Sequence, residues 1–207
     1  MAGSMSMTDL AADLMVTLHD TATIFQGEGD EHFRRFLSQA LPDMQLKRPL
    51  TRLGEVALLS NVPRYSLAHC PEFAGYKTHL WGTCMPRPWE PNYPGALPRV
   101  EATRDESAWW LVLDPAPTWK HIGAFGHSLR FWYYGLHVLG AEAATTTISP
   151  DDRGLLLLRA QAEAMRELAI RNAGKPVQMR DGLSGTPRNS TPAAMHETLM
   201  RLFREAR

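Results

Sequence analysis

The sequence lacks the features of membrane-spanning, secreted and disulfide-bonded proteins. It has no apolar run near the roughly 20 residues that cross a bilayer. Its first ten residues show no cationic segment followed by an apolar stretch, so they predict no secretory signal. The only cysteines are Cys70 and Cys84, which we expect to be reduced. These absences predict a cytoplasmic protein, with residues 1–7 as a tag-like, disordered start.

Neither sign of charge is in excess, since 22 Lys and Arg residues balance 22 Asp and Glu residues. A dedicated nucleic-acid domain is usually strongly basic, and this composition argues against one. Basic residues do gather near the C-terminus, where Arg201, Arg204 and Arg207 lie on a predicted helix. Weak nucleic-acid binding through phosphate contacts of these arginines is therefore one alternative function.

The sequence motifs of several enzyme classes are also missing. The stretch "GLSGT" at 182–186 has the wrong glycine spacing for a nucleophile elbow. The stretch "HETLM" has Met200 where the helix of a zinc protease needs its second histidine. No glycine-rich phosphate loop and no dinucleotide fingerprint occur. The sequence thus predicts no cofactor and favours a non-catalytic protein.

Two residue groups keep a chemical alternative open. A carboxylate near imidazoles supplies a general base at neutral pH, so a small hydrolase is an alternative, with a site formed by Asp114, His121, His127 and His137. The second group has the ligand types that zinc prefers, and comprises His69, Cys70, His79 and Cys84. Its intervals do not form two close-set pairs, so we favour no metal and expect the cysteines to be small buried hydrophobes.

Helical periodicity is clearest at the two ends of the chain. Leucines at four-residue steps predict a helix over 8–19 with Thr8 as its N-cap. Asp30 caps a second predicted helix, which Pro42 ends. A third begins at Ser149 and closes at Gly174, and its predicted inner face comprises Leu155, Leu158, Ala162, Met165 and Ala169. A fourth begins at Thr191, with a stripe of Met195, Leu199, Leu202 and Phe203.

The middle of the chain has the composition of strands and loops. Residues 52–61 and 107–114 have the composition of short strands. Between them, residues 61–100 hold seven of the fifteen prolines together with six aromatic residues, which predicts an ordered, packed loop region. The aromatic segment 125–138 fits a helix or a strand, and apolar residues at helical spacing slightly favour the helix.

These patterns predict a single compact α+β domain with helices at both ends, short central strands and a long loop region rich in proline and aromatic residues. The domain spans 8–174, followed by a flexible connector at 175–191 and an amphipathic helix at 192–207. One small domain is not expected to bury all the aromatic side chains in the middle third of the chain. We therefore expect an accessory or regulatory protein that covers them by binding another protein or itself as a homo-oligomer. The residues expected to bind the partner are Trp81, Trp89, Tyr93, Phe131 and Tyr134.

Overall fold

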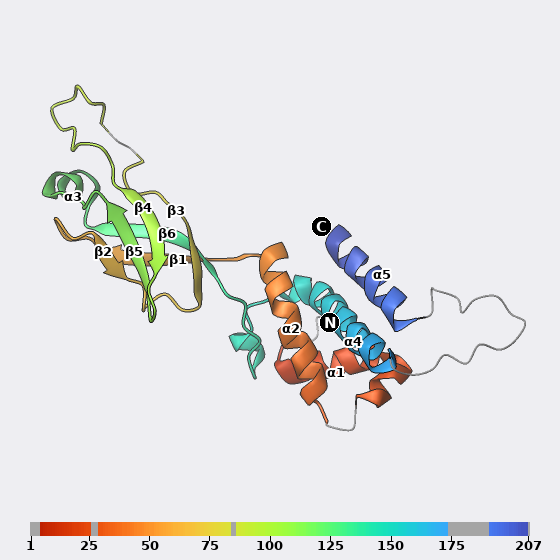
Figure 1. Ribbon diagram of the computed structural model, residues 1–207. Coiled ribbons are helices and arrows are strands. Elements are labelled where there is room, and N and C mark those ends of the chain that lie inside the picture. Colours follow the sequence, from red (N-terminus) through yellow and green to blue (C-terminus); the bar gives the residue numbers. More distant parts are fainter. Residues whose placement is uncertain (1–4, 26–28, 84–85, 174–190, 207) are drawn as a thin grey trace, which may run out of the picture. The chain divides into compact units, whose positions relative to one another are not determined.

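The computed structural model describes residues 5–25, 29–83, 86–173 and 191–206. Helices and antiparallel strands together build the fold, which confirms the α+β class with helices at both ends. Contacts group the chain into two compact units. Residues 49–136 form one, here called the β-unit, and residues up to 48 together with those from 137 onward form the other, here called the helical unit. The helical unit therefore combines both ends of the colour scale in Figure 1.

The predicted segment boundaries do not coincide with the division into two units. The segment 8–174 contains both junctions between the units, at 48/49 and 136/137. At the start of the chain, Met5 is buried and Ser6 is the N-cap of the first helix in place of Thr8. The predicted connector at 175–191 lies outside the described residues except for Thr191. Among the described helices, none combines the length and apolar character that crossing a membrane requires.

The β-unit consists of two three-stranded antiparallel sheets and one short helix (Figure 1). The first sheet has its central strand at β6 and runs in the order β1 (Leu50–Ala57), β6 (Ser128–Gly135) and β3 (Phe73–His79). The second has its central strand at β5 and runs in the order β2 (Arg64–Ser66), β5 (Trp109–Asp114) and β4 (Arg99–Arg104). The strands predicted within 52–61 and 107–114 are thus confirmed as β1 and β5.

The aromatic segment near residue 130 is a strand, so the preference for a helix was wrong. β6 pairs with β1 on one side and with β3 on the other, and these two ladders bond its backbone as fully as a helix would. Its side chains alternate between faces: Leu129, Phe131 and Tyr133 are buried, while Trp132 and Tyr134 are partly exposed. The two-residue period of the strand thus places Trp132 and Tyr134 on the face opposite the buried residues.

Close packing of the buried face explains one glycine of the neighbouring strand. Gly54 of β1 lies opposite Phe131 in the antiparallel register. A Cβ atom at this position would lie 2.7 Å from the Phe131 ring. The sheet therefore needs glycine here to let the ring rest against its backbone.

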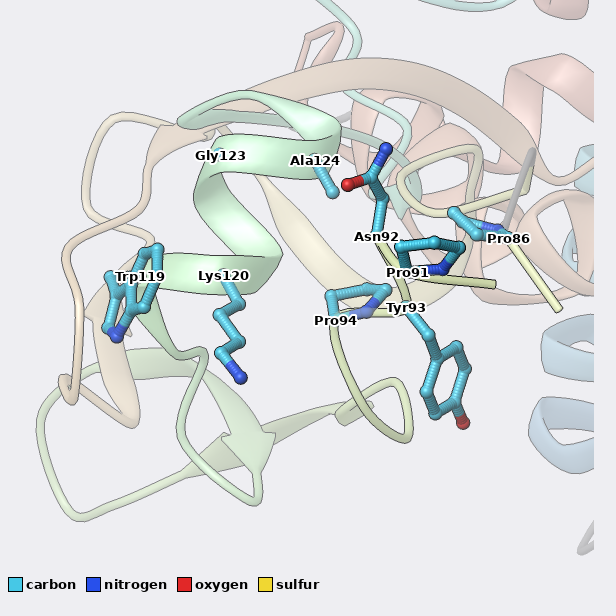
Figure 2. A pocket seen from close by; sticks show the side chains of 9 residues that line it. All are labelled: Pro86, Pro91, Asn92, Tyr93, Pro94, Trp119, Lys120, Gly123 and Ala124. Carbon is cyan, nitrogen blue, oxygen red and sulfur yellow. The ribbon is translucent and has the colours of Figure 1, made fainter. Parts of the chain in front are cut away.

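The proline-rich middle region contains short elements, as expected, but one helix was missed. β2 and β3 lie within 61–100, and neither exceeds seven residues. No helix was predicted between the strand within 107–114 and the aromatic segment 125–138, yet helix α3 (Trp119–Phe125), the light-green helix of Figure 2, lies there. Its N-cap is Thr118, placed just after the prolines end. Prolines before an N-cap do not oppose a helix, because they only keep the preceding backbone extended.

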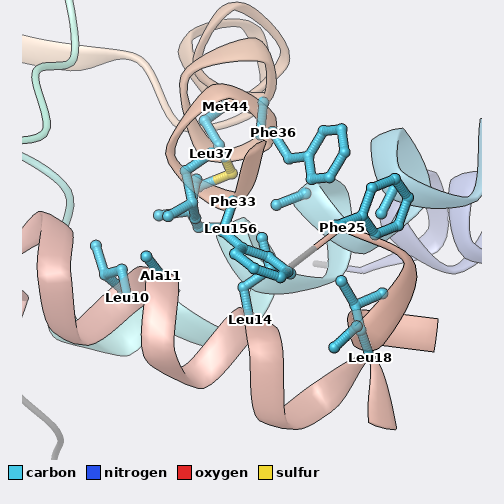
Figure 3. Packing of buried hydrophobic residues seen from close by; sticks show 14 of the residues in the cluster. Leu10, Ala11, Leu14, Leu18, Phe25, Phe33, Phe36, Leu37, Met44 and Leu156 are labelled. Atoms are coloured by element: carbon cyan, nitrogen blue, oxygen red, sulfur yellow. The ribbon is translucent and has the colours of Figure 1, made fainter. Parts of the chain in front are cut away.

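The helical unit is built from four α-helices and short 3-10 turns around one hydrophobic cluster. The described α-helices are α1 (Met7–Thr17), α2 (Glu31–Lys47), α4 (Arg153–Asn172) and α5 (Pro192–Glu205). The described 3-10 turns are η1 (His19–Ile24), η3 (Ala143–Thr145) and η4 (Pro150–Asp152). Figure 3 shows the core, where the rings of Phe33 and Phe36 meet Phe25 edge-on, with centroids 6.5 and 5.1 Å from it.

Pro42 does not end the second helix, contrary to the prediction. α2 continues through it to Lys47. Pro42 is exposed, whereas Met44, two residues further on, is fully buried. Burial of Met44 against the core offsets the backbone hydrogen bond that proline removes from the helix.

The inner face of α4 is broader than predicted and is rotated from it. Ser149 caps η4, which leads directly into α4, as the sequence indicated. The buried apolar positions are Leu156, Ala160, Ala162, Ala164 and Leu168, so only Ala162 of the predicted face is among them. The reason is that α1, α2 and α5 all pack on this helix, and more than one side of it is covered.

The last helix begins as predicted but buries less. Thr191 accepts a hydrogen bond from the Ala194 N–H, and Pro192 occupies the first turn. Of the predicted stripe only Phe203 is buried, while Met195 and Leu202 are more than 40% exposed. Because α5 packs chiefly on α4, one side of its stripe stays open.

Candidate functional site

The candidate site is a groove of the β-unit between helix α3 and the proline-rich segment 86–94 (Figure 2). Its volume is about 480 Å³. One wall comes from the segment, through Pro86, Pro91, Asn92, Tyr93 and Pro94. The other wall comes from α3, through Trp119, Lys120, Gly123 and Ala124.

A reciprocal hydrogen-bond pair fixes the start of α3. The Thr118 hydroxyl accepts a bond from the His121 N–H at 3.4 Å, and His121 Nδ1 accepts one from the Thr118 N–H at 3.1 Å. This capping box satisfies two backbone donors that a helix start would otherwise leave free. Trp119 and Lys120 lie between the two capping residues, so their position at the rim of the groove is set by the cap.

His121 lies close to Gly95, the residue that follows Pro94 of the opposite wall. Its side chain is buried, and a Cβ atom at Gly95 would lie 3.7 Å from His121 Nε2. Within the described residues Nε2 has no hydrogen-bond partner, whereas Nδ1 accepts the hydrogen bond of the cap.

The floor of the groove is open because the second turn of α3 carries small side chains. Gly123 and Ala124 are both exposed. A Cβ atom at Gly123 would meet no other atom within 4 Å. A larger side chain can therefore be added at residue 123 without displacing the fold, and it would fill the groove.

The polar groups around this floor are available to a ligand. Within the described part of the chain, Trp119 Nε1, Lys120 Nζ, the Tyr93 hydroxyl and the Asn92 amide take part in no hydrogen bond. Lys120 Nζ lies 5.8 Å from the centre of the Trp119 ring. Trp119 is 71% exposed. Most of these groups are donors, and Lys120 is the only charged residue among the described residues of the lining.

The five residues predicted to bind a partner have different environments. Tyr93 lines the groove. Trp89 is 74% exposed but lies outside the lining, and Tyr134 is half-buried beneath Lys77 Nζ at 5.4 Å. Trp81 is buried and donates its indole N–H to the Gly126 carbonyl at 3.0 Å. Phe131 is fully buried, so its predicted contact with a partner is excluded by the alternation of β6.

Sequence reasoning missed the α3 wall of the groove. Trp119 and Lys120 were not singled out, because the segment around them was treated as irregular. A signal was present: a threonine directly after the last proline of "PAPTWKH" is a helix N-cap pattern. It would have placed the following tryptophan and lysine in an exposed first turn.

The predicted hydrolase residues are divided between the two units. His137 belongs to the helical unit, where its Nε2 bonds the Arg48 carbonyl at 2.6 Å and its Nδ1 bonds the Thr147 hydroxyl at 3.2 Å. Asp114 ends β5 and His127 precedes β6, both exposed, while His121 is buried in its capping box. Among the described residues, no hydrogen bond joins any two of these four side chains.

The predicted zinc ligands are engaged elsewhere. Residues with described coordinates include no cluster of three or more His, Cys, Asp or Glu residues suited to a metal ion. His69 Nε2 bonds the Glu55 carbonyl at 2.8 Å, and His79 Nδ1 pairs with the Tyr76 hydroxyl. Burial lowers the pKa of His79. It raises the pKa of the Cys70 thiol, which is a small buried hydrophobe, as expected. Cys84 lies outside the described residues.

The arginines predicted to contact nucleic acid lie on α5. Arg201 and Arg204 are exposed, and Arg207 lies outside the described residues. The Arg204 carbonyl accepts a hydrogen bond from Lys47 Nζ at 2.8 Å, which ties the end of α5 to α2. Two exposed arginines on one helix form no built phosphate site.

Comparison of the chain with protein-family models finds no match, and comparison with curated proteins finds none either.

Proposed function

We propose that this protein is a non-catalytic accessory or regulatory protein of the cytoplasm that binds another protein through the groove between α3 and residues 86–94. The observation that supports this proposal is an exposed tryptophan, Trp119, beside an open floor at Gly123 and three further polar side chains, Lys120, Tyr93 and Asn92, that have no hydrogen-bond partner among the described residues. Tryptophan and tyrosine are enriched in the energetic centres of protein interfaces. A side chain this exposed gains free energy when a partner covers it.

The chemistry of the lining favours binding over catalysis. Among the described residues that line the groove there is no carboxylate, histidine, serine or cysteine. These residues therefore offer no nucleophile next to a base, which acyl or phosphoryl transfer would require. A small-molecule pocket usually encloses most of its ligand, whereas Trp119 at the rim is 71% exposed. A larger partner that covers the rim fits this geometry better.

Two matched pairs of variants test the proposal. Trp119→Ala removes the rim tryptophan, and Trp89→Ala removes a tryptophan of nearly equal exposure, at 74%, that belongs to the segment 86–94 but is not among the residues that line the groove. Gly123→Leu fills the floor, and Gly123→Ala changes helix propensity in the same direction without filling it. Each variant is used as bait in extracts of the source cells, and bound proteins are quantified.

We expect the wild type, Trp89→Ala and Gly123→Ala to retain the same bound protein, and Trp119→Ala and Gly123→Leu to lose it. Loss of a central tryptophan costs about 2 kcal/mol or more, roughly a thirtyfold loss of affinity. If the bound protein is a second copy of this chain, light scattering at two concentrations shows a doubled mass that Trp119→Ala abolishes. Retention of the partner by both groove variants would refute the proposal.

A further inference from the structure

The walls of the groove exclude one common way of holding a peptide. A partner strand added to a sheet needs a row of free backbone N–H and C=O groups. Pro86, Pro91 and Pro94 have no N–H, and the Tyr93 N–H already bonds the Glu90 carbonyl at 3.0 Å. The facing wall is a helix, whose backbone groups are largely used internally. The partner must therefore be recognised through side chains.

The available side-chain groups match a ligand rich in acceptors. Trp119 Nε1 and the Tyr93 hydroxyl are donors at the tips of rings, and the Asn92 amide adds a donor on the same side of the groove as Pro91 (Figure 2). A polyproline II segment has no internal hydrogen bonds, so all its carbonyl groups point outward and need donors. Its proline rings pack well on aromatic faces, which is how aromatic grooves hold such segments.

The charge of the groove adds a second requirement. Lys120 is the only charged residue among the described residues of the lining, and Figure 2 shows its side chain extending from α3 between Trp119 and Pro94. Among the described residues, the lining contains no acidic residue that would neutralise Lys120, and Lys120 takes part in no ion pair. A carboxylate of the partner beside Lys120 would supply the missing counter-charge.

From these three observations we infer that the groove takes an extended, proline-containing segment of a partner protein that carries an acidic side chain next to its prolines. This inference rests on the proposed function and specifies its ligand. The volume of about 480 Å³ accommodates a short segment of this kind. Lys120 determines the preference for the acidic residue, and Trp119 provides the face on which a proline ring rests.

Defined peptides test the inference on the full-length protein. The probe is a fluorescein-labelled polyproline peptide with one central glutamate, and its binding is measured by fluorescence anisotropy. A second peptide has glutamine in place of the glutamate, and a third places the glutamate in a flexible glycine and serine chain. We expect the glutamate polyproline peptide to bind about fivefold tighter than the glutamine peptide, as one partly exposed ion pair allows. The flexible peptide should bind more weakly still, because it pays more entropy on ordering.

Variants assign each preference to its residue. Lys120→Gln should abolish the difference between the glutamate and glutamine peptides, and Lys120→Glu should prefer a polyproline peptide with lysine. Trp119→Ala should lose all three peptides, whereas Trp89→Ala should bind as the wild type does. Equal binding of the glutamate and glutamine peptides, equal binding of the flexible peptide, or no binding of any peptide would overturn the inference.

The two proposals fail in distinguishable ways. If no peptide binds but Trp119→Ala and Gly123→Leu still lose the cellular partner, the ligand class is wrong and the proposed function stands. If these variants keep the cellular partner, the proposed function is wrong as well.

Discussion

The two units of this protein use aromatic residues in opposite ways. All six tryptophans and all five tyrosines lie within residues 49–136, the β-unit. The core of the helical unit is built from aliphatic residues and phenylalanine, and Phe25, Phe33 and Phe36 are fully buried there. In the β-unit, by contrast, Trp89 and Trp119 are more than 70% exposed. The two small sheets do not bury all of these aromatic rings. The exposed rings are the reason that the candidate site lies in the β-unit.

The units also differ in the polar groups that they bury. In the helical unit, Arg159 and Glu163 are buried on α4, paired at 2.5 Å, and Arg159 also pairs with Asp43 at 2.5 Å. In the β-unit, His121 is the buried polar side chain of the described residues, and it caps a helix. A helix enclosed on several sides must bury part of its polar face, whereas a sheet can keep its polar face in water.

The largest expected effect comes from replacing one buried phenylalanine in the core of each unit. The hydrophobic clusters of the two units share no residue, so Phe36→Ala and Phe131→Ala should each destabilise only its own unit, by about 4 kcal/mol. In urea unfolding, helical circular dichroism reports mainly on the helical unit and tryptophan fluorescence reports on the β-unit. Leu46→Ala, at a residue that is 82% exposed, is the control with almost no effect. If either phenylalanine variant shifts both curves equally, the units fold as one and the comparison does not hold.

A smaller effect is expected from the buried ion pairs of α4. Glu163→Gln should lower the free energy of unfolding of the helical unit by about 3 kcal/mol, because it leaves the buried Arg159 without one of its two carboxylates. Glu167→Gln is the matched control on the same helix, since Glu167 pairs with the exposed Arg35 and Arg171 and should matter by less than about 1 kcal/mol. If thermal unfolding shows the same loss of stability in both variants, the burial of α4 does not determine how much its ion pairs contribute to stability.

The smallest expected effect concerns an exposed turn of the β-unit. The N–H groups of Ala108 and Ser107 hold the pKa of Asp105 below its ordinary value of 3.8, and the indole N–H of Trp110 and the Arg64 charge add to this. Because the folded-state pKa is lowered, the carboxylate stabilises the fold above pH 3.8 and this contribution is lost as pH falls through the folded-state pKa. Asp105→Asn should therefore flatten the acid side of the melting profile followed by tryptophan fluorescence. A profile as steep as that of the wild type would assign the acid sensitivity to other groups.

Sequence patterns located most elements, because their signals are local. The N-caps at Ser149 and Thr191 and the strands within 52–61 and 107–114 depend on residues a few positions apart. The failures involve partners far along the chain. Whether residues near 130 form a helix or a strand depends on two ladders, from 50–57 and from 73–79, and no local period contains that information.

The lining of the candidate groove was predicted in part for the same reason. Tyr93 and the prolines of 61–100 stood out by composition, and Tyr93 with three of these prolines, Pro86, Pro91 and Pro94, belongs to one wall of the groove. The other wall needed α3, and only its pairing with that segment makes Trp119 and Lys120 part of a site. Phe131, chosen for its ring, proved to be core, because one step along a strand reverses the face that a side chain occupies.

By itself, the sequence determined the α+β class, the helix caps at Ser149 and Thr191 and the concentration of rings in the middle of the chain. These properties follow from backbone propensity, capping and composition, which act over a few residues. Tertiary structure decided which rings are buried, which side of α4 is enclosed and that α3 faces the proline-rich segment across a groove. Exposure is a property of surfaces brought together from distant segments, so it is established only when those segments have packed.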